Sequence, residues 1–231
     1  MPSEQLATKQ DNPYTSPQAG KDSSGFRDFA GSSKTAFVLI CAAIVAAALT
    51  RLIPHPFNFT PIGAMALFAG ANIRNRALAL IVPLAAMALS DAFLTHDLWQ
   101  MHVVVYTTFA VTVGLGMLLG YCRDSLLARS ERGSSLVPNW LKSALISALC
   151  VGSFALFTSL LFFVVTNFAC WQFYPFYDKT LAGLTACYVA AIPFFGNTLA
   201  GDLFYCFVLF GGFALARQFA QLVKRRAATA S

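Results

Sequence analysis

Charged residues are scarce in this sequence. Only 11% of its 231 residues are Asp, Glu, Lys or Arg, whereas 57% are hydrophobic. A soluble domain is about a quarter charged and about half apolar, so the apolar excess needs lipid to cover it. The shortage of charge therefore argues against an ordinary soluble domain and predicts an integral membrane protein.

The sequence also lacks the patterns of a metal site and of a nucleic-acid surface. The six cysteines stand in or beside apolar runs without a C-x-x-C pair, so we interpret them as reduced packing residues. No His, Cys or carboxylate spacing specifies a metal, and we expect no cofactor. The net charge is +6, but the basic residues stand at the ends of apolar runs, so we expect no nucleic-acid partner.

Long apolar runs are what the sequence does contain. Five predicted spans are each about long enough to cross roughly 30 Å of hydrocarbon at 1.5 Å per residue. Two further apolar segments are short and bounded by Pro, Gly or Asn. The spans cover residues 35–53, 77–94, 102–120, 143–166 and 198–219, and the short segments cover residues 61–72 and 181–195.

The positions of Lys and Arg predict the topology. They gather at 74–76, 123–142 and 217–226 and are missing from 95–101 and 167–178. Because positively charged loops stay in the cytoplasm, we expect six crossings with both termini cytoplasmic. The first short segment then crosses as a tilted helix, and the second forms an elbow or half-helix on the outer side. This path leaves the basic residue Arg51 outside.

These features predict an all-α, polytopic transmembrane helix bundle of about six spans with two short or broken segments, formed by residues 35–222. Residues 1–34 are rich in Ser, Gln, Gly, Asp and Lys and cannot bury enough apolar surface to fold alone, so we expect a disordered cytoplasmic tail. Residues 223–231 form a basic C-terminal tail.

Two aspartates lie inside apolar spans, where an ionisable group costs roughly 2.5 kcal/mol or more near the centre and usually marks function. Asp91 follows Arg76 by 15 residues and Asp202 precedes Arg217 by 15, so each lies roughly 22 Å from a cytoplasmic anchor. We expect them in an outward-facing pocket for a small polar or cationic solute. The expected lining is Asp91, Asp202, Asn58, His55, Asn167, Trp171, Asn197 and Tyr205. Alternatively, each aspartate caps a helix or bonds nearby backbone.

The first span carries a stripe of small residues. Ala42 and Ala46 are four residues apart, as are Ala43 and Ala47, which permits close helix approach. We expect this face to dock a membrane subunit or to pack within the bundle.

Three motifs carry a resemblance: the run from Arg51 to Ala64, the pair Ser90-Asp91, and the segment from Cys187 to Asp202. Together they resemble a family of uncharacterised bacterial integral membrane proteins over residues 35–222. The resemblance implies the bacterial cytoplasmic membrane and supplies no activity.

The chain also resembles, more weakly, the solute-binding S-components of energy-coupling factor vitamin transporters. Those proteins have six helices, an outward-facing pocket and a small-residue face on the first helix that meets a membrane coupling subunit. The resemblance implies that Ala42 and Ala46 form the docking face. It implies a pocket near Asn58, Asp91, Asn167 and Asp202.

Three functions follow from these observations. The leading hypothesis is a small-solute-binding or transport subunit. An intramembrane enzyme is the main alternative, because two aspartates can share a proton and activate water. The aspartyl-protease signature Gly-x-Gly-Asp, however, lacks its first glycine in Leu199-Ala200-Gly201-Asp202. The third hypothesis is a structural or assembly subunit whose polar residues only join helices.

Overall fold

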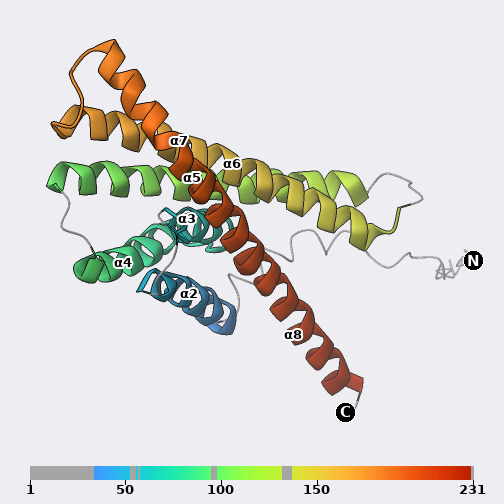
Figure 1. The fold of residues 1–231 in the computed structure, drawn as a ribbon. Helices are drawn as coiled ribbons and strands as arrows, with labels where there is room; N and C mark the ends of the chain where they lie inside the picture. The colour runs from blue at the N-terminus through green and yellow to red at the C-terminus, as the bar shows by residue number, and fades with distance from the viewer. Residues whose placement is uncertain (1–33, 53–55, 57, 95–97, 132–136, 230–231) are drawn as a thin grey trace, which may run out of the picture.

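The described part of the chain is helical throughout its regular structure. The computed structural model describes residues 34–52, 56, 58–94, 98–131 and 137–229, and every regular element within them is a helix (Figure 1). The predicted fold class is confirmed. In chain order the elements are α2 (Lys34–Leu49), the 3-10 turn η1 (Thr50–Leu52), α3 (Ile62–Asn72), α4 (Arg76–Leu94), α5 (Trp99–Glu131), α6 (Asn139–Phe173), α7 (Leu181–Cys206), the π-helical turn η2 (Phe207–Gly211) and α8 (Gly212–Thr229).

Three helices are long and apolar enough to cross a membrane. They cover Trp99–Ser130, Asn139–Phe173 and Leu181–Leu222, and two shorter apolar helices cover Phe37–Leu49 and Ile62–Asn72. Many large apolar side chains on the long helices are exposed, where lipid rather than water would cover them favourably. By length and composition these helices suit a membrane protein. The six crossings and the orientation of the termini stay predictions.

The second short segment differs from its prediction. We expected residues 181–195 to form a separate elbow or half-helix, but they are the first part of α7, which continues through η2 into α8. Pro193 lies inside α7 and does not end it. A proline removes one backbone donor, and apolar surroundings tolerate that loss where neighbouring groups satisfy the freed carbonyl. The prediction that the segment is separate, which rests on the Pro, Gly and Asn residues that bound it, is therefore wrong.

Helix α3 lies at the centre of the bundle. Ten of its eleven residues are buried, and it contacts α2, α4, α5, α6, α7 and η2. It approaches α5 closely because Gly70 and Gly116 face each other: a Cβ on Gly70 would lie 2.1 Å from the Val113 carbonyl oxygen. On another side the Phe68 ring packs edge-on against Phe210, with centroids 5.1 Å apart. The short helix thus holds the long ones together.

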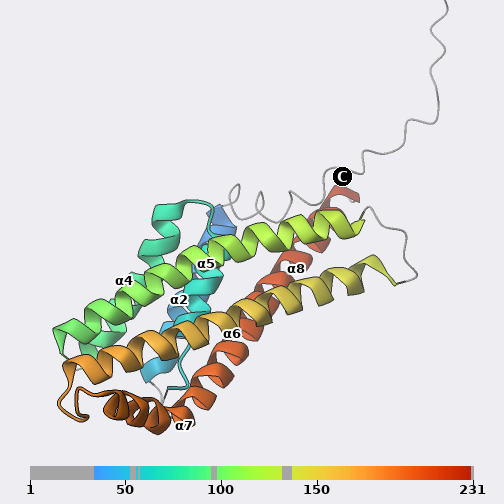
Figure 2. The ribbon, with the colours of Figure 1, turned by 90° about the horizontal axis from the view of Figure 1, so that it is seen from above.

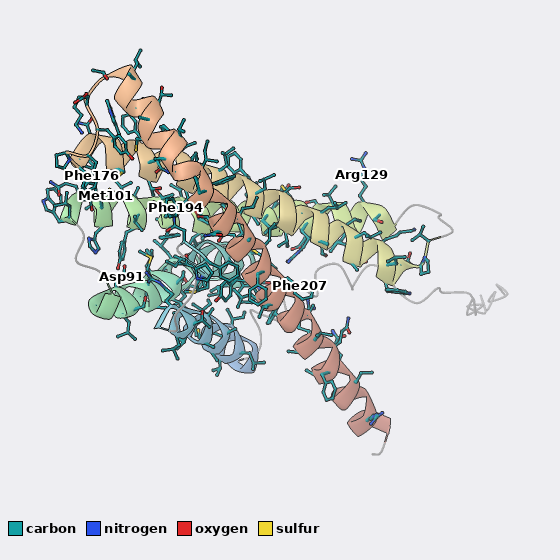
Figure 3. The ribbon with its side chains drawn as sticks, in the orientation of Figure 1. Asp91, Met101, Arg129, Phe176, Phe194 and Phe207 are labelled. Atoms are coloured by element: carbon teal, nitrogen blue, oxygen red, sulfur yellow. The ribbon has the colours of Figure 1, made fainter. Side chains whose placement is uncertain are left out.

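The helix connections separate to two ends of the molecule. Figures 1 and 2 place the C-terminal end of α5, the N-terminal end of α6 and the C-terminal end of α8 toward one end, and the α6–α7 connection toward the other. Figure 3 shows Arg129 at the first end and Met101 and Phe176 at the second. This arrangement agrees with the predicted grouping of the basic segments 123–142 and 217–226.

Candidate functional site

Arg51 and Asp91 form an ion pair between two helical segments. Arg51 follows α2 in η1, and Asp91 lies near the end of α4 (Figure 3). Arg51 Nη1 is 2.7 Å from Asp91 Oδ1, and the two side chains are only 11% and 10% exposed. Buried charges are tolerated when they are paired. The pairing with Asp91 therefore accounts for the position of Arg51, which the predicted topology separates from the cytoplasmic basic clusters.

Two hydroxyl groups complete the surroundings of this pair. Arg51 Nη1 donates to Ser90 Oγ at 2.5 Å, and the Ser90 hydroxyl donates to the Met87 carbonyl at 2.8 Å. Tyr106 of α5 donates to Asp91 Oδ2 at 3.1 Å. Arg51, Ser90, Asp91 and Tyr106 are called the ionic cluster below. It joins η1, α4 and α5 through charged and hydroxyl groups that can bind a polar solute.

Tyr205 connects α7 to the residue beside Arg51. The Thr50 hydroxyl donates to the Ala47 carbonyl at 2.7 Å and lies 3.0 Å from the Tyr205 hydroxyl. Since Thr50 has one hydroxyl hydrogen, which Ala47 accepts, Tyr205 is the donor to Thr50. The Tyr205 ring also packs against Phe59, with centroids 5.8 Å apart. The last long helix is thereby tied to the segment that carries Arg51.

Asp202 caps helix α3 from a different helix. It is 5% exposed, and its Oδ2 accepts a hydrogen bond from Ser159 Oγ of α6 at 2.6 Å. The backbone amide of Ala64, in the first turn of α3, also bonds its carboxyl group. The N-cap residue of α3, Pro61, offers no side-chain hydrogen bond. The first amides of a helix lack partners within it, and the positive end of the helix attracts a carboxylate, so Asp202 supplies the cap.

Two glycines make this approach possible. A Cβ on Gly63 would lie 2.4 Å from Asp202 Oδ1, and a Cβ on Gly201 would lie 3.1 Å from the Thr60 amide nitrogen. Asn58, in the turn that precedes α3, has a φ of 62°. The motif from Arg51 to Ala64 and the motif ending at Asp202 are therefore halves of one contact.

The predicted pocket residues divide between two regions. Asp91 pairs with Arg51, and Tyr205 lies beside Thr50. Asp202 instead contacts Ser159 and the Ala64 amide. Asn58 is exposed and precedes Phe59, whose ring packs against Tyr205. Asn167 and Trp171 make their hydrogen bonds elsewhere, to the backbone of α6 and of the α6–α7 connection. Asn167 Nδ2 donates to the Phe163 carbonyl at 2.7 Å, Trp171 Nε1 donates to the Asp178 carbonyl at 2.9 Å in the α6–α7 connection, Asn197 is half-buried on α7, and His55 lies outside the described residues.

The two small-residue pairs of α2 face different ways. Ala47 is buried in the core and Ala43 is half-buried against it, whereas Ala42 and Ala46 are exposed. The docking face predicted for Ala42 and Ala46 is therefore on the surface of this chain.

Sequence reasoning missed several partners at these sites. Arg51 was noted only as a basic residue outside the topology, although its isolation from the other cations was a signal of pairing. Ser90 stood within a recognised motif without a role. Tyr106 and Ser159 offered no pattern at all. A serine hydroxyl in an apolar span usually bonds its own helix backbone, and a tyrosine in such a span packs its ring like other apolar residues.

The His, Cys, Asp and Glu side chains of the described residues do not gather into a metal-binding cluster. Among residues 34–52, 56, 58–94, 98–131 and 137–229, no group of three or more His, Cys, Asp and Glu could hold a metal ion. The six cysteines are free thiols, half-buried or buried, as the packing interpretation expects.

Comparison with known proteins gives one result. No curated protein and no solved structure matches the chain. A family model described as a family of unknown function, DUF6580, matches residues 31–225, which is most of the chain. The motifs that form the contact between Gly63 and Asp202 and the ion pair of Arg51 all lie within the matched residues. The protein is a member of the DUF6580 family.

Proposed function

We propose that this protein binds a small polar solute within a membrane, as a binding or transport subunit, and that the ionic cluster is the binding site. One observation carries the proposal: Arg51 and Asp91 pair at 2.7 Å while largely removed from the surface, on segments far apart in sequence. Ionisable groups at membrane depth are rare and usually mark a solute or ion pathway.

Stability alone is a poor reason to keep such a pair. Desolvating two charges can cost as much as their attraction returns, and well-packed apolar residues are often as stable in the same place. A pair that remains nevertheless suggests a use for both charges. A solute can use both charges by taking the place of Asp91 beside Arg51 and the place of Arg51 beside Asp91.

The chemistry of the cluster indicates the class of solute. A purely cationic solute would have to displace Arg51 from Asp91 and leave the guanidinium unpaired. A solute with both an acidic and a basic group would satisfy both side chains, with its acidic group on Arg51 and its basic group on Asp91. The Ser90 and Tyr106 hydroxyls, already bonded to the pair, would orient it. A zwitterionic small molecule therefore fits best.

The weaker resemblance to transporter S-components is compatible with this proposal. In those proteins a small-residue face on the first helix meets a coupling subunit, and Ala42 and Ala46 are exposed on α2. In this reading the exposed face receives a membrane coupling subunit in a bacterial cytoplasmic membrane, and Asp202 supports the site by holding α3.

The paired-aspartate enzyme is less well supported. Two carboxyl groups that share a proton must face each other closely. The Asp202 carboxyl group instead accepts from Ser159 and Ala64, and the Asp91 carboxyl group is against Arg51 and Tyr106. The partners given for each acid favour separate roles.

A thermal-shift screen with purified protein tests the proposal. The panel should contain amino acids, vitamins, nucleobases and simple cations. We expect a zwitterion to raise the unfolding temperature of the wild-type protein. The variants Arg51→Gln, Asp91→Asn and the double variant should lose that shift.

The double variant separates binding from structure. Replacing both charges by amides avoids leaving one unpaired, so its stability without solute should exceed that of either single variant. Asp124→Asn is the matched control. Asp124 Oδ1 lies 3.4 Å from Arg123 Nε on α5, so this substitution removes a carboxylate from a different arginine. A double variant that still responds to the solute would reduce the ionic cluster to a structural joint between helices.

A further inference from the structure

Helix α8 leaves the bundle after its first residues. Phe213 is 7% exposed, and its ring packs edge-on against Phe68 of α3, with centroids 5.7 Å apart. Beyond it the helix extends away from the other helices to the C-terminal end, as Figure 1 shows. One end of α8 is therefore anchored in the core while the rest presents its faces to the surroundings.

The extended part of α8 has an apolar stripe. Leu215, Phe219 and Leu222 are 67%, 72% and 56% exposed. Their spacing of four and three residues puts them on one side of the helix. This stripe is the last part of the apolar surface of the membrane-length helix Leu181–Leu222, on which Phe207 is 78% exposed. An apolar stripe that continues a lipid-facing surface favours lipid as its cover.

The charge of α8 has one sign only. The sequence Gly212–Thr229 contains four basic residues and no Asp or Glu. At its base Arg217 interacts electrostatically with Arg123 and Asp124 of α5, so two cations share one carboxylate. Arg123 is itself buried, with its Nε 3.4 Å from Asp124 Oδ1. The region where α8 leaves the bundle thus carries an excess of positive charge.

From these observations we infer that α8 is an interfacial anchor that binds anionic phospholipid. The apolar stripe lies against the acyl chains at the membrane boundary, and the basic residues lie among the headgroup phosphates. An apolar stripe followed by basic residues gains from both contacts, and each basic residue near an anionic surface improves binding by roughly fivefold. This inference goes beyond the proposed solute site and does not depend on it.

Hydrogen exchange in lipid nanodiscs tests the inference on the full chain. The protein is placed in nanodiscs of neutral phosphatidylcholine or of phosphatidylcholine with about a third phosphatidylglycerol. We expect the backbone amides of residues 218–229 to exchange at least about tenfold more slowly in the anionic discs than in the neutral discs. Added salt at about 1 M should abolish this difference in exchange rate, because it shortens the Debye length to about 3 Å.

Two charge-matched variants decide the cause. Lys224→Gln/Arg225→Gln/Arg226→Gln removes three charges from α8 and should abolish the lipid-dependent protection. The control Arg74→Gln/Arg76→Gln/Arg129→Gln removes three exposed basic residues elsewhere and should keep it. Equal exchange of wild-type α8 in both discs would overturn the inference. So would protection that follows protein concentration instead of lipid charge, since that would identify another copy of the chain as the occupant.

Discussion

The substitution Gly63→Ala tests the contact between α3 and Asp202 most sharply. The added Cβ would lie 2.4 Å from Asp202 Oδ1 and 2.9 Å from Cγ, whereas ordinary contacts begin near 3.4 Å. The carboxyl group would have to move by about 1 Å, which strains or breaks its 2.6 Å bond with Ser159 and its bond with the Ala64 amide.

The expected loss of stability is about 3 kcal/mol. Overpacking a tight site costs about 1–3 kcal/mol, and losing a hydrogen bond to a charged group costs about 1.5–3 kcal/mol. For a chain of this length each kcal/mol lowers the unfolding midpoint by roughly 2–4 °C, so the midpoint should fall by roughly 6–12 °C. Unfolding in detergent, followed by fluorescence-detected size exclusion after heating, measures it.

Gly152→Ala is the matched control, because a Cβ there meets nothing within 4 Å and alanine favours a helix interior. Its midpoint should stay the same or rise slightly. The double variant Gly63→Ala/Asp202→Ala should lose less stability than the sum of the single variants, since alanine at 202 makes room for the new methyl group. If Gly63→Ala unfolds like Gly152→Ala, or if the two losses are additive, Asp202 does not cap α3 as described.

Three further predictions concern other contacts. Gly116→Ala should lower the stability by about 2 kcal/mol or more, because its Cβ would lie 2.4 Å from the Leu67 carbonyl oxygen, whereas Gly114→Ala on the same helix meets nothing within 4 Å and should be neutral in the same heating assay. Tyr205→Phe should cost about 1 kcal/mol by removing the donor to Thr50, and unchanged unfolding would show that this bond contributes nothing. Lys179→Gln should speed proteolysis of the α6–α7 connection, because the Lys179 ammonium donates to the Tyr174 carbonyl and lies 5.5 Å from the centre of the Trp171 ring; equal cleavage of both proteins would contradict this.

The helices themselves could largely be predicted, because apolar runs report where lipid covers the chain. The run predicted over residues 77–94 differs from α4 by one residue at its start. The runs at 102–120 and 143–166 fall short of both ends of α5 and α6, since helical hydrogen bonding continues beyond the apolar run. Apolar length therefore indicates the span and not the whole helix.

The contacts at the site could not be predicted in the same way. The pairing of Arg51 with Asp91 joins residues 40 positions apart, and the capping of α3 by Asp202 joins residues even more distant. Hydropathy does not indicate which distant residues of the sequence come into contact. The glycines at 63 and 201 stood within recognised motifs, yet only the fold shows that each leaves room for the other segment.

The proposed solute binds at the ionic cluster. An experimental structure of the protein in a membrane mimetic, determined with the zwitterion selected by thermal shift, tests it most directly. We expect solute density in contact with both Arg51 and Asp91, with Arg51 Nη1 and Asp91 Oδ1 farther apart than 2.7 Å. Density bound elsewhere, with the Arg51–Asp91 pair intact, would contradict it.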